Sequence, residues 1–191
     1  MDLDPRRSDK KLLLITGMPG AGKSTAAMET RELGFDVVVM GDIIREETAS
    51  RGFSITDLNC GRVMKEIREE MGPSVIARLS IPKIQASQKS LIAIDGVRSK
   101  SEVDEFRAAF PSTRLLAILA SQDRRYDLIT KRSREDRPSD RTVFNARDER
   151  ELKVGVGELI PEAEEVILNE KITLIDLRTR LLTLVRGMFG L

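Results

Sequence analysis

Short, continuous apolar runs recur along this chain between longer segments with helical patterning. They cover residues 12–15, 37–40, 91–94, 115–119 and 166–168. Strands that are buried on both faces have this pattern, and their alternation with helical segments predicts a parallel sheet in an α/β fold. The leucine- and arginine-rich tail, Leu174–Phe189, has the pattern of a closing amphipathic helix.

Two segments interrupt the simple alternation. Residues 43–85 predict a long helical insertion between the second and third strands, and residues 123–153 are unusually dense in arginine. Gly34 is expected to end the first helix, and Phe110-Pro111-Ser112 the helix before the fourth strand. No Pro/Gly/Ser-rich linker divides the 191 residues, so we expect a single domain over residues 1–191.

A glycine-rich stretch follows the first apolar run directly and has the pattern G-x-x-x-x-G-K-[ST]. It reads Gly17-Met18-Pro19-Gly20-Ala21-Gly22-Lys23-Ser24, and Thr25 opens a segment of good helix formers. Glycines let successive backbone N–H groups turn inward around phosphates, while Lys23 reaches the outer phosphates and the Ser24 hydroxyl ligates magnesium. A chance glycine-rich turn is the alternative, but strand, loop and helix occur in the order that phosphate binding needs. The stretch 17–25 therefore predicts a nucleoside triphosphate site with magnesium, in a three-layer P-loop NTPase fold.

The amino-acid composition restricts the partners and the catalytic groups that this protein can use. Lysine plus arginine (32) and aspartate plus glutamate (31) nearly cancel, so there is no global electrostatic reason to bind nucleic acid or an anionic membrane. The N-terminus is polar and no apolar stretch approaches a membrane span, which predicts a cytoplasmic protein. Histidine is absent, so catalysis must use carboxylates, cationic side chains, backbone amides and a bound metal. The single cysteine, Cys60, is expected to be a small, partly buried apolar residue.

The third apolar run ends in Asp95-Gly96-Val97-Arg98. A carboxylate at the C-terminal edge of a parallel strand lies where open α/β sheets bind ligands, so Asp95 can hold magnesium or its water. The alternative is that Asp95 and Gly96 merely form a turn at the strand end. Arg98 is ambiguous alone, because a lone arginine is usually a solvated surface group.

The second apolar run continues into Gly41-Asp42-Ile43-Ile44-Arg45. Asp42 can be explained without function, as the N-cap of a helix. Arg45 is harder to dismiss, because the end of the second strand faces the same edge as the P-loop. From there its guanidinium could bind the phosphate of an acceptor through two hydrogen bonds.

Between positions 124 and 137 there are six basic residues and three acidic ones, and Arg141 and Arg147 follow. The six basic residues are Arg124, Arg125, Lys131, Arg132, Arg134 and Arg137. A charged helical face explains such density. The alternative is a mobile lid whose arginines supply positive charge to a transferring phosphoryl group. The loop Pro138-Ser139-Asp140 directly follows Arg137, as a lid would require.

These motifs, in this order and spacing, resemble the nucleoside monophosphate kinase superfamily, with similarity to adenylate kinase and dephospho-CoA kinase. The chain is most similar to an uncharacterised family of archaeal P-loop proteins described as kinase-like. The similarity extends over nearly the whole chain, including 40–48, 81–84, 147–152 and 166–169. Adenylate kinases have Asp-Gly-Phe-Pro-Arg where this chain has Asp95-Gly-Val-Arg98, so Arg98 departs from the family pattern.

The resemblance implies an ATP-binding core, an acceptor-binding insertion (43–85) and an arginine-bearing lid (123–153). Asp42 and Arg45 fall at the Gly-Asp-x-x-Arg of adenylate kinases, which implies that Arg45 binds the acceptor phosphate. With a hydroxyl acceptor, as in dephospho-CoA kinases, Asp42 becomes the leading candidate base.

The sequence thus predicts a kinase that transfers the γ-phosphoryl of ATP to a small acceptor, such as a nucleotide. Lys23, Asp95, Asp42, Arg132 and Arg137 are its candidate catalytic residues. The metal ligands are Ser24 and Asp95, and the candidate acceptor-binding residues are Asp42, Arg45 and Arg98. The competing hypothesis is a slow ATPase that acts as a nucleotide-gated switch for a protein or RNA partner.

Overall fold

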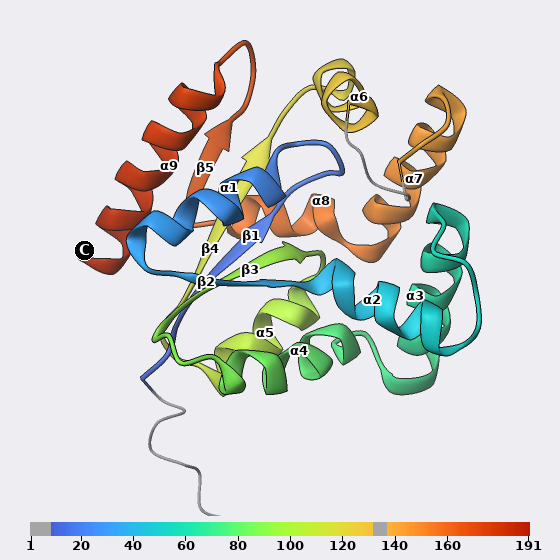
Figure 1. Ribbon diagram of the computed structural model, residues 1–191, viewed down its shortest axis with the longest axis horizontal. Coiled ribbons are helices and arrows are strands. Elements are labelled where there is room, and N and C mark those ends of the chain that lie inside the picture. The colour runs from blue at the N-terminus through green and yellow to red at the C-terminus, as the bar shows by residue number, and fades with distance from the viewer. Residues whose placement is uncertain (1–8, 132–136) are drawn as a thin grey trace, which may run out of the picture.

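A sheet of five parallel strands forms the centre of the computed structural model, which describes residues 9–131 and 137–191. The strands lie in the order β2-β3-β1-β4-β5 (Figure 1). Their bounds are β1 (Lys11–Thr16), β2 (Asp36–Val39), β3 (Leu91–Val97), β4 (Thr113–Leu119) and β5 (Glu165–Leu168). All five predicted strands are confirmed. Met40, however, already belongs to the following helix, and β3 continues through Asp95 and Gly96 to Val97.

Helices cover both faces of this sheet, giving the predicted three-layer α/β fold (Figure 1). One face carries α1 (Lys23–Glu29), the short helix η2 (Thr30–Leu33) and α9 (Leu174–Phe189). The other carries α2 (Met40–Ser50), α3 (Asp57–Met71), α4 (Val75–Ala86), α5 (Lys100–Ala109) and the turns α8 (Val156–Leu159) and η3 (Ile160–Glu162). Between β4 and β5 the chain also forms α6 (Gln122–Thr130) and α7 (Arg141–Val154), which lie near the carboxyl ends of the strands.

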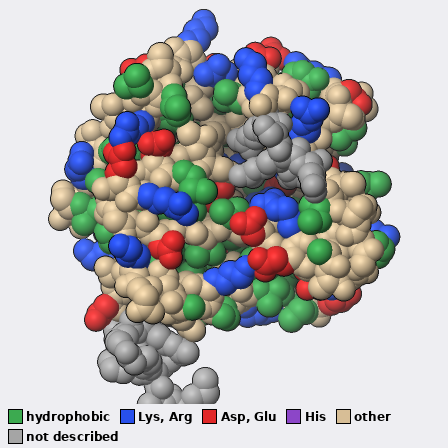
Figure 2. Space-filling model, in the orientation of Figure 1, with side chains coloured by type: hydrophobic (Ala, Val, Ile, Leu, Met, Phe, Trp, Pro, Cys, Tyr) green, Lys and Arg blue, Asp and Glu red, His purple; other side chains and the backbone are tan. Residues whose placement is uncertain are grey.

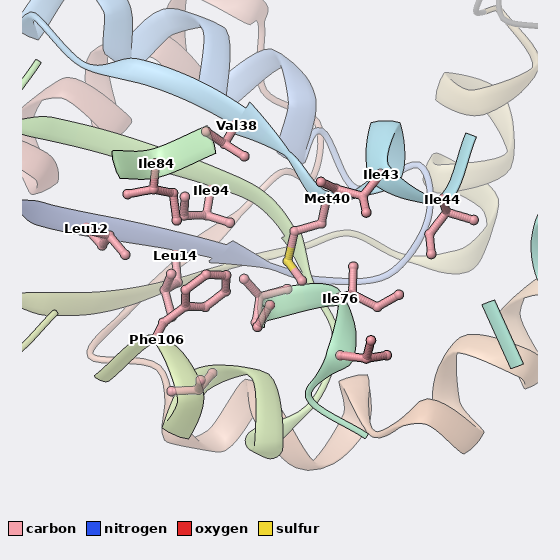
Figure 3. Close-up of a cluster of buried hydrophobic side chains, with 14 of the residues drawn as sticks. Leu12, Leu14, Val38, Met40, Ile43, Ile44, Ile76, Ile84, Ile94 and Phe106 are labelled. Carbon is pink, nitrogen blue, oxygen red and sulfur yellow. The ribbon is translucent and has the colours of Figure 1, made fainter. Parts of the chain in front are cut away.

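Successive residues of β1 point to opposite faces of the sheet and so enter two different cores. Leu12 and Leu14 pack with Phe106 of α5 and Ile84 of α4 (Figure 3). Leu13 and Ile15 belong to the second cluster, which contains the buried faces of α1 and α9. All four β1 side chains have no exposed surface. This two-sided burial is the physical reason why β1 is a continuous apolar run.

The predicted end of α5 is confirmed, whereas α1 itself ends at Glu29 and Gly34 ends the short helix η2 that continues it. Gly34 caps η2 in the left-handed conformation at φ 85°, and Phe110 caps α5. Residues 43–85 form the predicted helical insertion, as α2, α3 and α4. The interpretation of Asp42 as an N-cap is wrong: β2 runs directly into α2, so Val39 is the N-cap and Asp42 lies in the first helical turn. An acid there still interacts favourably with the helix dipole.

Two further observations concern the molecule as a whole. Among the described residues, no helix is long and apolar enough to cross a bilayer. Figure 2 shows basic and acidic side chains interspersed over one face of the molecule rather than gathered into a patch of one sign.

Candidate active site

The phosphate-binding loop joins β1 to α1 through glycines that no other residue could replace without strain. Gly17, Gly20 and Gly22 have φ of 137°, 84° and 106°. A Cβ at Gly17 would lie 2.2 Å from the carbonyl oxygen of Ile118, and one at Gly20 would lie 2.4 Å from that of Arg125. Positive φ and close backbone approach are both properties of glycine. The loop conformation is therefore encoded by the glycines of the motif.

A cleft lies beside this loop and is lined from both halves of the chain. The lining comes from the P-loop, the ends of β2 and β3, the insertion and α7. The ionic residues that line it are Lys23, Arg45, Asp57, Asp95, Arg98, Arg147, Arg150 and Glu151. Ser24, Gly41, Ile44, Cys60, Gly61 and Met64 also line the cleft. Segments more than one hundred residues apart in the chain thus share one concave surface.

Seven of the predicted site residues lie together in this cleft. The predicted residues that line it are Pro19, Gly20, Lys23, Ser24, Arg45, Asp95 and Arg98. Five others belong to the same loop and helix start but are not among the described residues that line the cleft: Gly17, Met18, Ala21, Gly22 and Thr25. Asp95 is 3% exposed, between Ile15 of β1 and Val39 of β2 in the register of the sheet. The sheet therefore presents this carboxylate beside the P-loop.

Three predicted residues are placed differently. Asp42 is not among the described residues that line the cleft; its carboxylate, 49% exposed, forms an ion pair with Arg45. Arg137 is exposed and is likewise not among the lining residues in the described ranges. Arg132 lies outside the described residues, as does Arg134.

The oxygen atoms of Ser24 and Asp95 suit a magnesium ion. Magnesium is typically held by one or two carboxylates together with substrate phosphates and water. In the part of the chain that the structure describes, no group of three or more His, Cys, Asp or Glu could hold a metal ion by itself. One hydroxyl and one carboxylate beside a phosphate-binding loop therefore fit a cation that arrives with a nucleotide.

Across the cleft, three residues that the sequence analysis did not single out, Asp57, Arg150 and Glu151, join Arg147 and Arg98. The Arg150 Nη2 donates to both carboxylate oxygens of Asp57 at 2.9 Å, and the Arg147 Nε lies 3.3 Å from Asp57 Oδ1. Gly61 on α3 makes room for this pairing, since a Cβ there would lie 2.9 Å from the Arg150 guanidinium carbon. The only sequence signal was the spacing 147, 150 and 151, which places three charges on one helix face.

Arg98 is fixed by a buried carboxylate on α7. Its Nε lies 2.7 Å from Glu151 Oε2, and its Nη1 contacts the Met64 sulfur at 3.6 Å. Burial works against ionisation of Glu151, but the positive charges of Arg98, Arg147, Lys23 and Arg150 outweigh it and hold the pKa of the carboxyl below its usual value. Glu151 is therefore an anion that organises the surrounding cations.

The arginine-dense segment has several roles. Arg125 forms a buried two-bond ion pair with Asp148, and Arg124 donates to the Ile172 carbonyl at 3.4 Å. Arg141 pairs with Asp123, and its guanidinium lies over the Tyr126 ring. Of the described arginines in this segment, Arg147 and Arg150 reach the cleft. A uniformly solvated face therefore does not account for the segment.

Comparison with known proteins supplies the family. A family model described as an AAA domain matches residues 16–150. The UPF0200 protein of Pyrococcus abyssi is 41% identical over 163 residues, which covers 83% of this chain and 87% of that protein. The UPF0200 protein of Methanoculleus marisnigri is 39% identical over 160 residues, covering 84% and 87%. The chain is an AAA-domain protein of the UPF0200 family. The resemblance to archaeal P-loop kinase-like proteins is thereby confirmed.

Solved structures agree on the fold of this UPF0200 chain. TT1252 from Thermus thermophilus matches with a TM-score of 0.68 at 17% identity, covering 94% of this chain and 98% of that one. Shikimate kinase from Acinetobacter baumannii matches with a TM-score of 0.60 at 15% identity, covering 94% and 95%. At such identities the likeness establishes the P-loop kinase-like fold alone and leaves the acceptor open.

Proposed function

We propose that this protein is a magnesium-dependent kinase that transfers the γ-phosphoryl of ATP to a small anionic acceptor, such as a nucleotide. The observation that carries the proposal is the shared cleft: Lys23, Ser24 and Asp95 line it together with Arg45, Arg98 and Arg147. A phosphate-binding loop beside several arginines is what transfer between two anionic molecules requires. In this proposal residues 43–85 bind the acceptor and 123–153 form the lid region.

Each group has a proposed role. The loop amides and Lys23 hold the ATP phosphates, while Ser24 and Asp95 provide oxygen ligands for magnesium. Magnesium bound there would neutralise charge on the phosphate oxygens. Arg45 and Arg98 orient the acceptor, with Arg147 and Arg150 as additional cations on that side. Phosphoryl transfer depends mainly on positioning and electrostatic stabilisation, so the absence of histidine is no obstacle.

The choice of general base depends on the acceptor. An acceptor that is already an ionised phosphate needs none. For a hydroxyl acceptor, Asp42 was the predicted base, but Asp57 and Glu151 are the carboxylates beside Asp95 that line the described cleft. Asp57 accepts hydrogen bonds from Arg150, and the pKa of Glu151 is held below its usual value. The Asp57 oxygens are thus already occupied by Arg150, and the lowered pKa makes Glu151 a weak base, which favours an acceptor that is already ionised.

The test is a transfer assay with γ-labelled ATP, magnesium, and a panel of nucleoside monophosphates and dephospho-CoA, with a blank that lacks acceptor. Label in one acceptor would establish the kinase and identify its substrate. Label released only as inorganic phosphate, at one slow rate across the panel, would refute transfer and support the ATP-driven switch. The variant Arg45→Gln, assayed in parallel, separates acceptor binding from ATP turnover.

A further inference from the structure

Two carbonyl groups of the phosphate-binding loop are held by side chains from distant elements. The carbonyl of Pro19 accepts from Nη1 of Arg125 on α6 at 3.1 Å. The carbonyl of Ala21 accepts from Nδ2 of Asn169, directly after β5, at 2.9 Å. Both contacts are buried and join residues separated by more than one hundred positions in the chain.

These contacts fix the direction of two amide groups. In a planar trans peptide, the carbonyl and the N–H of the same unit point in opposite directions. The peptide that carries the Pro19 carbonyl also carries the N–H of Gly20, and the one with the Ala21 carbonyl carries the N–H of Gly22. A donor that holds each carbonyl on one side therefore turns the following N–H to the other. Successive N–H groups turned inward are the means by which such loops bind phosphate.

Arg125 itself has little freedom to move. It is 6% exposed, and Asp148 on α7 accepts from its Nη1 and Nη2 at 2.7 and 2.6 Å. Its guanidinium carbon lies 5.2 Å from the centre of the Phe144 ring. The carbonyl of Arg125 also faces Gly20, where only glycine fits. The guanidinium is thus a preorganised donor to the loop, although the sequence alone groups Arg125 with the charges of the lid.

Asn169 has the same character. It is 4% exposed, and its Nδ2 would lie 2.8 Å from a Cβ at Gly22. Asn169 therefore packs directly against the loop residue whose N–H it orients. We propose that Arg125 and Asn169 are positioning residues of the nucleotide site, which act on ATP through the peptide groups of Gly20 and Gly22. This inference rests on the nucleotide-binding part of the proposed function and not on phosphoryl transfer.

The decisive experiment separates positioning from stability. In the double variant Arg125→Met/Asp148→Leu, apolar side chains replace the buried ion pair, a change that is often neutral for stability. The Pro19 carbonyl then lacks its donor. We expect thermal unfolding close to that of the unaltered chain, with affinity for magnesium-ATP, measured by calorimetry, weaker by about tenfold. Unaltered affinity in this variant would overturn the role of Arg125.

Should the double variant fail to fold, Arg125→Lys is measured in the same way. Its ammonium can pair with Asp148 but lacks the planar fork that reaches Pro19 at the same time. Loss of ATP affinity supports the inference, and unaltered affinity overturns it. Phe106→Leu, a core substitution on α5, controls for lowered stability alone and should leave ATP affinity unchanged.

Asn169→Ala tests the second donor, with the exposed Asn145→Ala on α7 as its matched control. We expect weaker ATP binding, again by about tenfold, in Asn169→Ala only. Equal affinities of the two asparagine variants would remove Asn169 from the inference. If the unaltered chain binds no ATP, the proposed function fails and this inference fails with it. If it binds ATP and the positioning variants bind equally well, only the inference fails.

Discussion

Asp57, the first residue of α3, and Arg150 of α7 are joined across the cleft by two hydrogen bonds, from one guanidinium nitrogen to both carboxylate oxygens, each 2.9 Å long. Asp57 is 14% exposed and Arg150 27% exposed. The pair therefore connects the predicted acceptor-binding insertion (43–85) to α7, which lies in the predicted lid region (123–153). Any anion that enters this side of the cleft meets arginines that already have a carboxylate partner.

Asp57→Asn should loosen this connection. Removing one partner of a mostly buried ion pair should lower stability by about 2 kcal/mol, or about 4–8 °C in unfolding temperature. Because Arg147 and Arg150 lose a competing anion, pyrophosphate should bind more tightly to the variant. Thermal unfolding and calorimetry check the two effects. Glu69→Gln, which removes an exposed carboxylate from the same helix, is the control, and identical behaviour of the two variants would contradict this account.

Lys23→Ala should abolish ATP turnover without unfolding the protein. The Lys23 Nζ donates to the Met18 carbonyl at 3.0 Å, and a hydrogen bond of this kind contributes only about 1 kcal/mol to the fold. Loss of the cation that stabilises the outer phosphates should lower turnover by at least about 100-fold. Phosphate-release assays and circular dichroism measure the two quantities. The exposed Lys65→Ala serves as control, and full turnover in Lys23→Ala would overturn the P-loop assignment.

Gly20 and Gly34 form a matched pair for testing the loop. Their φ angles are 84° and 85°, but a Cβ at Gly34 would meet nothing within 4 Å, whereas one at Gly20 would collide with the Arg125 carbonyl. In Gly34→Ala the free energy of unfolding should therefore fall only by the strain of an alanine in the left-handed conformation, about 1 kcal/mol. In Gly20→Ala it should fall by at least about 2 kcal/mol more, and the variant should bind ATP weakly. Denaturant unfolding of both variants measures the difference, and equal losses would show that the loop backbone can shift.

The sheet was predictable because burial on both faces leaves a strong signal in the sequence. Five apolar runs correspond to five strands among the described residues. The errors fall at boundaries, where apolarity does not distinguish conformations. Met40 is buried and apolar whether it ends a strand or starts a helix, so the direct passage from β2 into α2 was missed, and with it the true N-cap.

The residues of the cleft were predictable only where they belong to a sequence motif. Lys23, Ser24 and Asp95 follow from the P-loop and from the rule for strand ends. Asp57 and Glu151, in contrast, look like ordinary charges on helices, because an ion pair across 93 or 53 residues leaves no local pattern. Arg125 was assigned to a charged segment for the same reason, since its carboxylate partner lies on another helix.

Arg45→Gln should weaken binding of the acceptor and leave binding of ATP unchanged. Arg45 lines the cleft from α2, and the loss of one charge-assisted contact should raise the acceptor KM by about tenfold or more. Arg51→Gln is the matched control, because Arg51 caps the same helix and pairs with Glu47 and Glu66. Steady-state kinetics in both substrates provide the measurement. A raised KM for ATP in Arg45→Gln would count against the assignment.

Glu151→Gln should change how stability depends on pH. The cations around Glu151 lower its pKa in the folded protein, so its ionised form stabilises the fold above the ordinary carboxyl pKa of 4.5. That contribution disappears as the pH falls from 4.5 through the lower pKa of the folded state. At pH 7 the variant should be less stable by about 3 kcal/mol, because Arg98 loses a buried partner 2.7 Å away. Urea unfolding from pH 7 to pH 3 should show the free energies of unfolding of the variant and the unaltered protein converging as the carboxyl of the unaltered protein becomes protonated. Parallel curves would mean that Glu151 is not the anion that organises these arginines.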